Sequence, residues 1–371
     1  MKVHLQVDGS PPKVGDSARE IADLGADGVF SFEGQHDVFF PLVVAATETD
    51  LELMTNVAIT GPRSPLHLAH AAYDLQIYSH GRFRLGLGSQ IRVHIEKRYG
   101  SQWGSPAKRM AEAVAAVKAI FAAWEGLAPL DFRGEFFTHT LMPPNFNPGP
   151  NPIGPPPVLM GALGPVMTRK AAEIADGLLV MPFNSTRHFA ERTLPAVTEG
   201  LRRSGRDAHD FQVVAQAMVA VGTTEAELAT AIDRVASLIA FYGSTPNYRA
   251  VLEVEGWADL QPRLNELSKL GKYNDMRGLI SVRWSGPTGS WAHPKIAPTR
   301  FSAASARARR RSVATSRVTP PATPTSAISS PRSSAFPPFG EEAACADGCD
   351  ARNLKNQRCF KSSFRRAGSN P

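Results

Sequence analysis

Short apolar runs alternate with amphipathic stretches through the first 280 residues of the chain. The apolar runs predict strands, and the 3.6-residue spacing of apolar positions between them predicts helices. The predicted strands are residues 3–7, 28–32, 53–59, 83–87, 158–160, 178–181 and 211–221. Strands that are nearly continuously apolar and separated by helices are typical of a parallel sheet covered by helices.

The stretches between these strands carry helix signals. Helices are predicted at residues 14–24, 65–78, 107–124, 166–175, 258–270 and 273–280. Ser64 before Pro65 predicts a capped helix start, and Thr224 with Glu227 forms a capping-box pattern. An excursion, LDFRGEFFTHTLM, predicts a β-hairpin turning at Arg133 and Gly134. Seven βα units over residues 1–280 predict one α/β domain, a TIM-type (β/α)8 barrel.

The pattern breaks at residue 281, and no eighth apolar strand follows. Ser, Ala, Arg and Pro make up 52 of the last 91 residues, whereas Ile, Leu and Val number six. Such a segment buries too little apolar surface to offset its ordering entropy, so residues 281–371 are predicted to be a disordered tail. The barrel is then expected to lack its eighth strand or to have it replaced by this tail. Translation out of frame explains the composition, and a genuine extension is the alternative.

The tail also carries the positive charge of the chain. It holds 15 Lys and Arg against 4 Asp and Glu, while the net charge of the whole chain is +7. The predicted domain is therefore mildly acidic, which argues against a specific nucleic-acid partner. All three cysteines, Cys345, Cys349 and Cys359, lie in the tail, and no metal site is predicted. The polar start of the chain predicts no membrane partner and a cytoplasmic protein.

Residues after the predicted strands are the candidates for chemistry, because the carboxyl ends of barrel strands share one mouth. Gly164 and Pro165 open a helix whose N–H groups at Val166, Met167 and Thr168 suit a phosphate. An ordinary βα turn would use the same residues. His36, between Glu33 and Asp37, is a candidate proton donor, and a solvated loop histidine is the alternative.

Three stretches, GRFRLGLGSQ, MGALGPVMTRKAAEIADGLLVMPF and FRGEFFTH, resemble the bacterial luciferase-like superfamily. Within it they are most similar to the oxidoreductases that use the deazaflavin coenzyme F420, and the resemblance spans residues 1 to about 278. It implies a (β/α)8 barrel with a flavin-type ring in its mouth. It also implies hydride transfer to or from a small organic substrate, and a possible homodimer.

The resemblance also implies which residues form the site. Catalytic roles fall on His36, Glu33 and Asp37. The implied cofactor-binding residues are Ala58, Ile59, Thr60, Gly88, Ser89, Gln90, Gly161, Ala162, Leu163, Gly164 and Met167. A strained bulge against the ring is expected around residues 58–60, and the phosphate is expected at the loop 161–164. Two alternatives stay open: an FMN-dependent monooxygenase, and a non-functional, truncated barrel whose basic tail binds polyanions nonspecifically.

Overall fold

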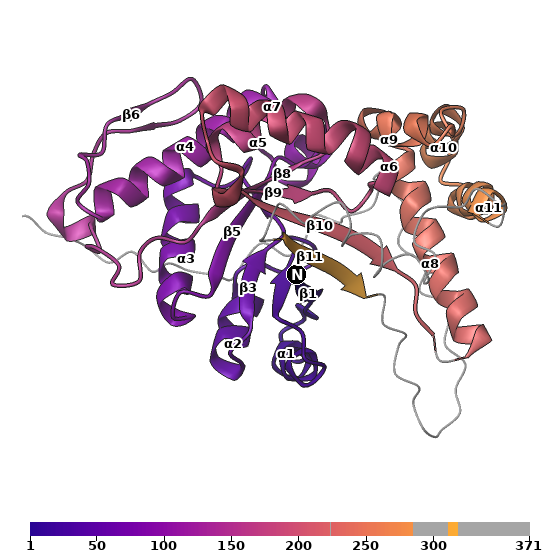
Figure 1. Cartoon of the computed structure of the whole chain (residues 1–371), viewed down its shortest axis with the longest axis horizontal. Helices are drawn as coiled ribbons and strands as arrows, with labels where there is room; N and C mark the ends of the chain where they lie inside the picture. Colours follow the sequence, from indigo (N-terminus) through magenta and orange to yellow (C-terminus); the bar gives the residue numbers. More distant parts are fainter. Residues whose placement is uncertain (223, 285–310, 318–371) are drawn as a thin grey trace, which may run out of the picture. The chain divides into compact units, whose positions relative to one another are not determined.

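A closed parallel sheet forms the centre of the protein. The computed structural model describes residues 1–222, 224–284 and 311–317. Its nine-stranded sheet has the order β3-β2-β1-β11-β10-β9-β8-β5-β4, and β3 also pairs with β5, so the pairings form a ring (Figure 1). The α/β fold with a parallel barrel sheet is therefore confirmed. The strands are β1 (Lys2–Gln6), β2 (Gly28–Ser31), β3 (Glu52–Thr55), β4 (Ala58–Ile59), β5 (Phe83–Gly88), β8 (Val158–Ala162), β9 (Gly177–Val180), β10 (Gln212–Val219) and β11 (Arg311–Arg317).

Helices follow the strands in the order expected for βα units. They are α1 (Val14–Asp23), α2 (Phe40–Glu48), α3 (Pro65–Tyr78), α4 (Pro106–Trp124), α5 (Pro165–Ile174), α6 (Thr186–His188), α7 (Leu194–Ser204), α8 (Glu225–Gly243), α9 (Arg249–Val254), α10 (Leu260–Lys269) and α11 (Tyr273–Trp284). The predicted caps are present: the Ser64 hydroxyl accepts from Leu66 N, and Thr224 and Glu227 form a capping box. None of the helices in the described residues is long and apolar enough to span a membrane.

The predicted third strand, residues 53–59, is split in two. β3 ends at Thr55, β4 begins at Ala58, and the peptide bond between Asn56 and Val57 is cis. Both pieces pair with β5, so they occupy a single position in the ring. The chain therefore bends out of the ladder at Asn56 and Val57, at the carboxyl end of the barrel.

The interior of the ring is layered. At the amino end of the strands, Glu52 of β3 contacts Lys2 and His4 of β1 and Arg84 of β5. The next layer toward the carboxyl ends of the strands is apolar, and Val57 packs against it. That apolar layer consists of Phe30, Met54, Leu159, Leu179 and Val214. A larger apolar core lies between the sheet and the helices and includes the buried Trp124 and Tyr73.

β11 occupies the eighth position of the ring, where the sequence pattern predicts that a strand is missing or replaced by the disordered tail. It pairs in parallel with β1 on one side and with β10 on the other (Figure 1). Unpaired strand edges expose N–H and C=O groups, which any segment able to extend can satisfy. RSVATSR contains Val and Thr, residues that favour strands, so it supplies an eighth strand from within the predicted tail. The other predictions for the tail, including its three cysteines, fall on residues 285–310 and 318–371, outside the described part.

The predicted β-hairpin is present between α4 and β8. β6 (Phe132–Arg133) pairs antiparallel with β7 (Thr138–His139), and Gly134 N donates to Phe137 O at 2.8 Å. The Glu112 carboxylate of α4 accepts hydrogen bonds from the backbone N–H groups of residues 135, 136 and 137 at 2.6–3.0 Å. This single side chain fixes the hairpin tip to the barrel.

Candidate active site

The carboxyl ends of the strands bring the predicted site residues to one mouth. Glu33, His36 and Asp37 follow β2, Thr60 follows β4, and Ser89 follows β5. The loop at residues 161–164 ends β8 and begins α5. Two contacts join these segments directly: Thr60 N donates to Gly88 O at 3.0 Å, and Ile59 N donates to the Glu33 carboxylate at 2.8 Å.

A small apolar platform lies at the centre of the mouth. A Cβ atom at Gly88 would lie 2.3 Å from Val57 Cγ2, and one at Gly161 would lie 3.4 Å from Val57 Cγ1 and 3.2 Å from Leu87 O. Both glycines therefore leave the space that the Val57 side chain occupies. Val57 is half-buried, so part of its side chain remains accessible. Val57 therefore packs over the backbone of Gly88 and Gly161, and these residues from β5, β8 and the bend after β3 form an apolar platform at the barrel mouth.

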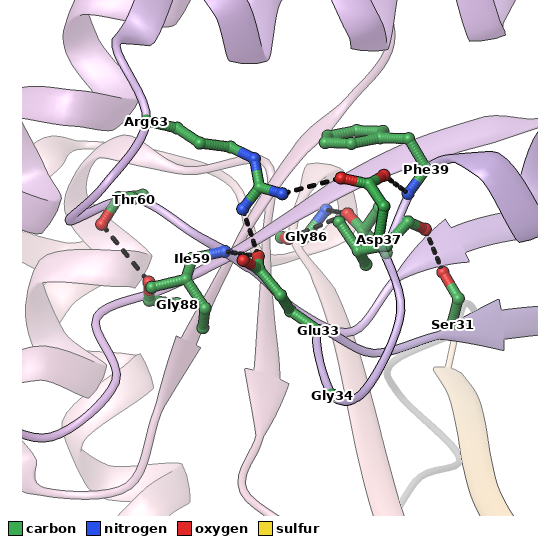
Figure 2. Close-up of polar contacts among 12 residues, drawn as sticks. Ser31, Glu33, Gly34, Asp37, Phe39, Ile59, Thr60, Arg63, Gly86 and Gly88 are labelled. Carbon is green, nitrogen blue, oxygen red and sulfur yellow. Dashed lines mark hydrogen bonds and ion pairs between the residues drawn. The ribbon is translucent and has the colours of Figure 1, made fainter. Parts of the chain in front are cut away.

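An ion-pair network borders this platform. Arg63 contacts the carboxylates of both Glu33 and Asp37, and Asp37 also accepts from Phe39 N at 2.7 Å (Figure 2). Burial opposes the charge of the Arg63 guanidinium, but the two carboxylates outweigh it and raise the pKa of Arg63. The Glu33 side chain is only 7% exposed. Because Glu33 also holds Ile59 N, it ties the β2 loop to the strand that follows the bend.

Tyr99 lies beside the same network. It follows a π-helical turn, His94–Arg98, and its hydroxyl is buried close to the Glu33 carboxylate. Burial and the negative charge of Glu33 raise the pKa of Tyr99. The phenol therefore keeps its proton at neutral pH and can donate it to a hydrogen bond.

His36 differs from its two acidic neighbours. It is exposed and lies near Asp8. Hydrogen bonds from Ser10 are the main cause that lowers the pKa of Asp8, and the proximity of His36 makes a smaller contribution. The structure thus brings Glu33 and Asp37 together through Arg63 and leaves His36 on the solvent side of the loop. Among the two aromatic residues that follow, Phe39 packs against the core and Phe40 is 73% exposed.

Thr60, Ser89 and Gln90 lie at the side of the platform. The Thr60 hydroxyl donates to Gly88 O at 3.3 Å and lies 3.1 Å from Met110 Sδ. Gln90 has a positive φ of 56°, which turns the chain away from β5 into the next loop. Thr60 and Ser89 also line a small cavity whose other wall includes Arg109 and Trp103.

The start of α5 provides backbone donors beside the loop 161–164. Gly164 is the N-cap residue, Pro165 occupies the first turn, and no side chain caps the helix. Thr168 N donates to Gly164 O at 3.0 Å, so the expectation that Thr168 N–H is free is wrong, because the first helical hydrogen bond uses it. Val166 and Met167 precede this bond, so their N–H groups have no acceptor within the helix. Nearby, Leu163 packs against the buried cluster around Phe183.

A known protein family matches most of the chain. A family model described as luciferase-like monooxygenase matches residues 2–283. The chain belongs to the luciferase-like monooxygenase family.

Individual relatives extend the comparison. An uncharacterized protein of Mycobacterium tuberculosis is 48% identical over 76% of this chain and 84% of its own length. The 5,10-methylenetetrahydromethanopterin reductase of Archaeoglobus fulgidus is 31% identical over 64% of this chain and 68% of its own length. Among solved structures, the coenzyme F420 dependent tetrahydromethanopterin reductase from Methanopyrus kandleri has a TM-score of 0.65 at 20% identity. That match covers 85% of this chain and 92% of the reductase, and it supports the fold.

Sequence reasoning missed two parts of this site. Arg63 is central to the ion-pair network, yet its position in the sequence identifies it only as one polar residue after a strand. Its partners Glu33 and Asp37 lie 30 and 26 residues earlier, so no local spacing predicts the pairing. The sequence pattern predicts that Asn56 and Val57 lie in the middle of a regular strand. A polar Asn inside an apolar run was the available signal of a bend.

Proposed function

We propose that this protein is an oxidoreductase that binds coenzyme F420 in the barrel mouth and transfers hydride to or from a small organic substrate. The observation that carries the proposal is the platform of Val57, Gly88 and Gly161. A tricyclic ring needs an apolar surface to pack against, and a side chain at Gly88 would displace Val57 from this one. The named reductases among the relatives support the same class.

The residues present fit such a cofactor. Gly88 and Gly161 would lie on the ring side of the mouth, and the buried Ala58 and Ile59 would support Val57 from within the core. The uncapped N–H groups of Val166 and Met167, at the positive end of a ten-residue helix, would hold the phosphate. Within this proposal, Thr60, Ser89 and Gln90 line one side, and residues 161–164 line the other.

When bound, the deazaflavin would supply the hydride chemistry. The chain must then position the substrate, exclude water and supply or remove a proton. His36 is the proposed proton donor, because it is the exposed, titratable group at the end of β2. Glu33 and Asp37 would act by fixing Arg63 and the loop that carries His36.

Equilibrium titration tests the cofactor assignment. Purified full-length protein is added to coenzyme F420, and the deazaflavin fluorescence is followed. Quenching at micromolar protein is expected. Co-purification of yellow FMN, with no effect on the deazaflavin fluorescence, would instead support an FMN-dependent monooxygenase.

A His36→Ala substitution tests the proton donor. It should lower turnover by about 1,000-fold, the middle of the range for general acid–base catalysis, while the affinity for coenzyme F420 stays unchanged. Steady-state kinetics and the fluorescence titration measure the two quantities separately. His209→Ala is the matched control, because His209 is exposed and lies just before the amino end of β10. It should leave both turnover and cofactor affinity unchanged. Unchanged turnover in His36→Ala would remove His36 from the mechanism.

A further inference from the structure

The interior of the barrel mouth contains a polar floor beside the apolar platform. Gln216 Nε2 of β10 donates to Asn56 Oδ1 at 2.9 Å. β3 and β10 are not neighbours, since three strands separate them in either direction round the ring. The hydrogen bond therefore crosses the inside of the barrel. Gln6 lies two residues beyond the buried His4 on β1, and so faces the same interior.

Asn56 keeps an unused donor in this floor. Its residue surface is 8% exposed, and its Nδ2 is buried with no hydrogen-bond partner among the described residues. The Oδ1 atom is already bonded to Gln216, and Asn56 N donates to Ser31 O at 2.7 Å. A buried amide group without an acceptor is costly and uncommon in folded proteins. The next residue is Val57, so this donor lies directly beside the platform.

The charge of the floor indicates which acceptor would suit it. Gln6, Asn56 and Gln216 are uncharged carboxamides. At the rim, Arg63 is compensated by Glu33 and Asp37. An anionic group bound at the floor would meet no uncompensated cation there, whereas a neutral carbonyl oxygen needs only a hydrogen-bond donor.

We infer that Asn56 Nδ2 donates a hydrogen bond to a neutral carbonyl oxygen of a bound ligand, with Gln216 holding the amide in place. The carbonyl comes either from the dione edge of the cofactor ring or from a ketone or aldehyde substrate. This inference rests on the proposed function for the identity of the ring, but the donor itself belongs to the chain. In this arrangement Asn56 is a ligand-binding residue and Gln216 is a positioning residue.

Asn56→Asp tests the assignment, because it keeps the shape and the acceptor for Gln216 but removes the donor. Loss of the hydrogen bond should weaken the affected ligand by about 10- to 100-fold. Asn151→Asp is the matched control: Asn151 is also buried with an unpaired Nδ2, but it lies in the proline-rich loop before β8. Coenzyme F420 affinity and the KM for a ketone substrate are measured in both variants.

Each result has a defined meaning. Weaker coenzyme F420 binding in Asn56→Asp alone assigns the carbonyl to the ring, and a raised KM with unchanged cofactor affinity assigns it to the substrate. A second measurement does not depend on the cofactor: the side-chain amide signal of Asn56 in ¹⁵N-labelled protein should shift on adding acetone. If wild-type protein fails to bind coenzyme F420 but this shift occurs, the proposed function fails and the Asn56 donor stands; absence of the shift together with unchanged affinities overturns the donor.

Discussion

Glu52→Gln is expected to lower the free energy of unfolding by about 2 kcal/mol, because it removes the anion from a partly buried cluster of charged groups. Lys2, His4 and Arg84 all contact the Glu52 carboxylate inside the barrel. His4 is fully buried and Arg84 is mostly buried, whereas Lys2 is exposed. Denaturant unfolding at pH 7 measures the change. Glu199→Gln, which breaks exposed ion pairs with Arg202 and Arg203, is the control and should cost under about 1 kcal/mol.

The same substitution has a defined pH dependence. Burial alone would raise the pKa of Glu52, but hydrogen bonds from His4, Lys2 and Arg84 outweigh it and hold that pKa well below its usual range. A depressed pKa in the folded state gives stability that is complete above the unfolded value of about 4.3 and is lost as the pH falls below it. The difference between wild type and Glu52→Gln should therefore be constant from pH 6 to about 7 and shrink below about pH 4. A difference that grows in acid would contradict this account of the cluster.

Gly88→Ala is expected to weaken coenzyme F420 binding by about 100-fold while the barrel still folds. The added Cβ would lie 2.3 Å from Val57 Cγ2, which is too close for any real contact. Val57 must then move, and it lies half-buried in the bend after β3. Its displacement changes the apolar surface on which the ring is proposed to lie.

Gly278→Ala is the control for this substitution. It adds the same methyl group in α11 with no described atom within 4 Å, so its affinity for the cofactor should match that of wild type. Fluorescence titration and thermal unfolding are measured on both variants. Wild-type affinity in a well-folded Gly88→Ala protein would exclude Val57 and Gly88 from the cofactor site.

Much of the fold follows from local sequence pattern. Strands such as residues 83–87 are short and apolar, and their order with amphipathic helices predicts a parallel barrel. Ser64 and Thr224 each cap the start of a helix, because their side chains accept hydrogen bonds from backbone N–H groups two or three residues later. α2 was missed because FPLVVAATE is almost entirely apolar and has no amphipathic period. β11 was missed because a strand that closes a ring is selected by the open edges of its neighbours, β1 and β10, more than by its own composition.

The site is less predictable than the fold. The loops after strands identify Glu33, Asp37 and Gly161 as mouth residues, since any parallel barrel brings these segments together. The pairing of Arg63 with two carboxylates, and of Asn56 with Gln216 across the barrel, depends on three-dimensional closure. The number of residues between Asn56 and Gln216 is too large for any pattern of spacing to reveal their contact.

β11 also bears on the hypothesis of a non-functional remnant. That hypothesis depends on an open barrel, and the ring of pairings among the described strands is closed. A single cooperative unfolding transition of the purified full-length protein is expected for a closed barrel. Aggregation without such a transition would favour the remnant.

The most direct measurement is a crystal structure of the full-length protein with coenzyme F420. The account predicts the ring against Val57, in contact with Gly88 and Gly161, and the phosphate at the N–H groups of Val166 and Met167. A ring bound at any other surface, or a mouth that stays empty at saturating cofactor, would contradict it.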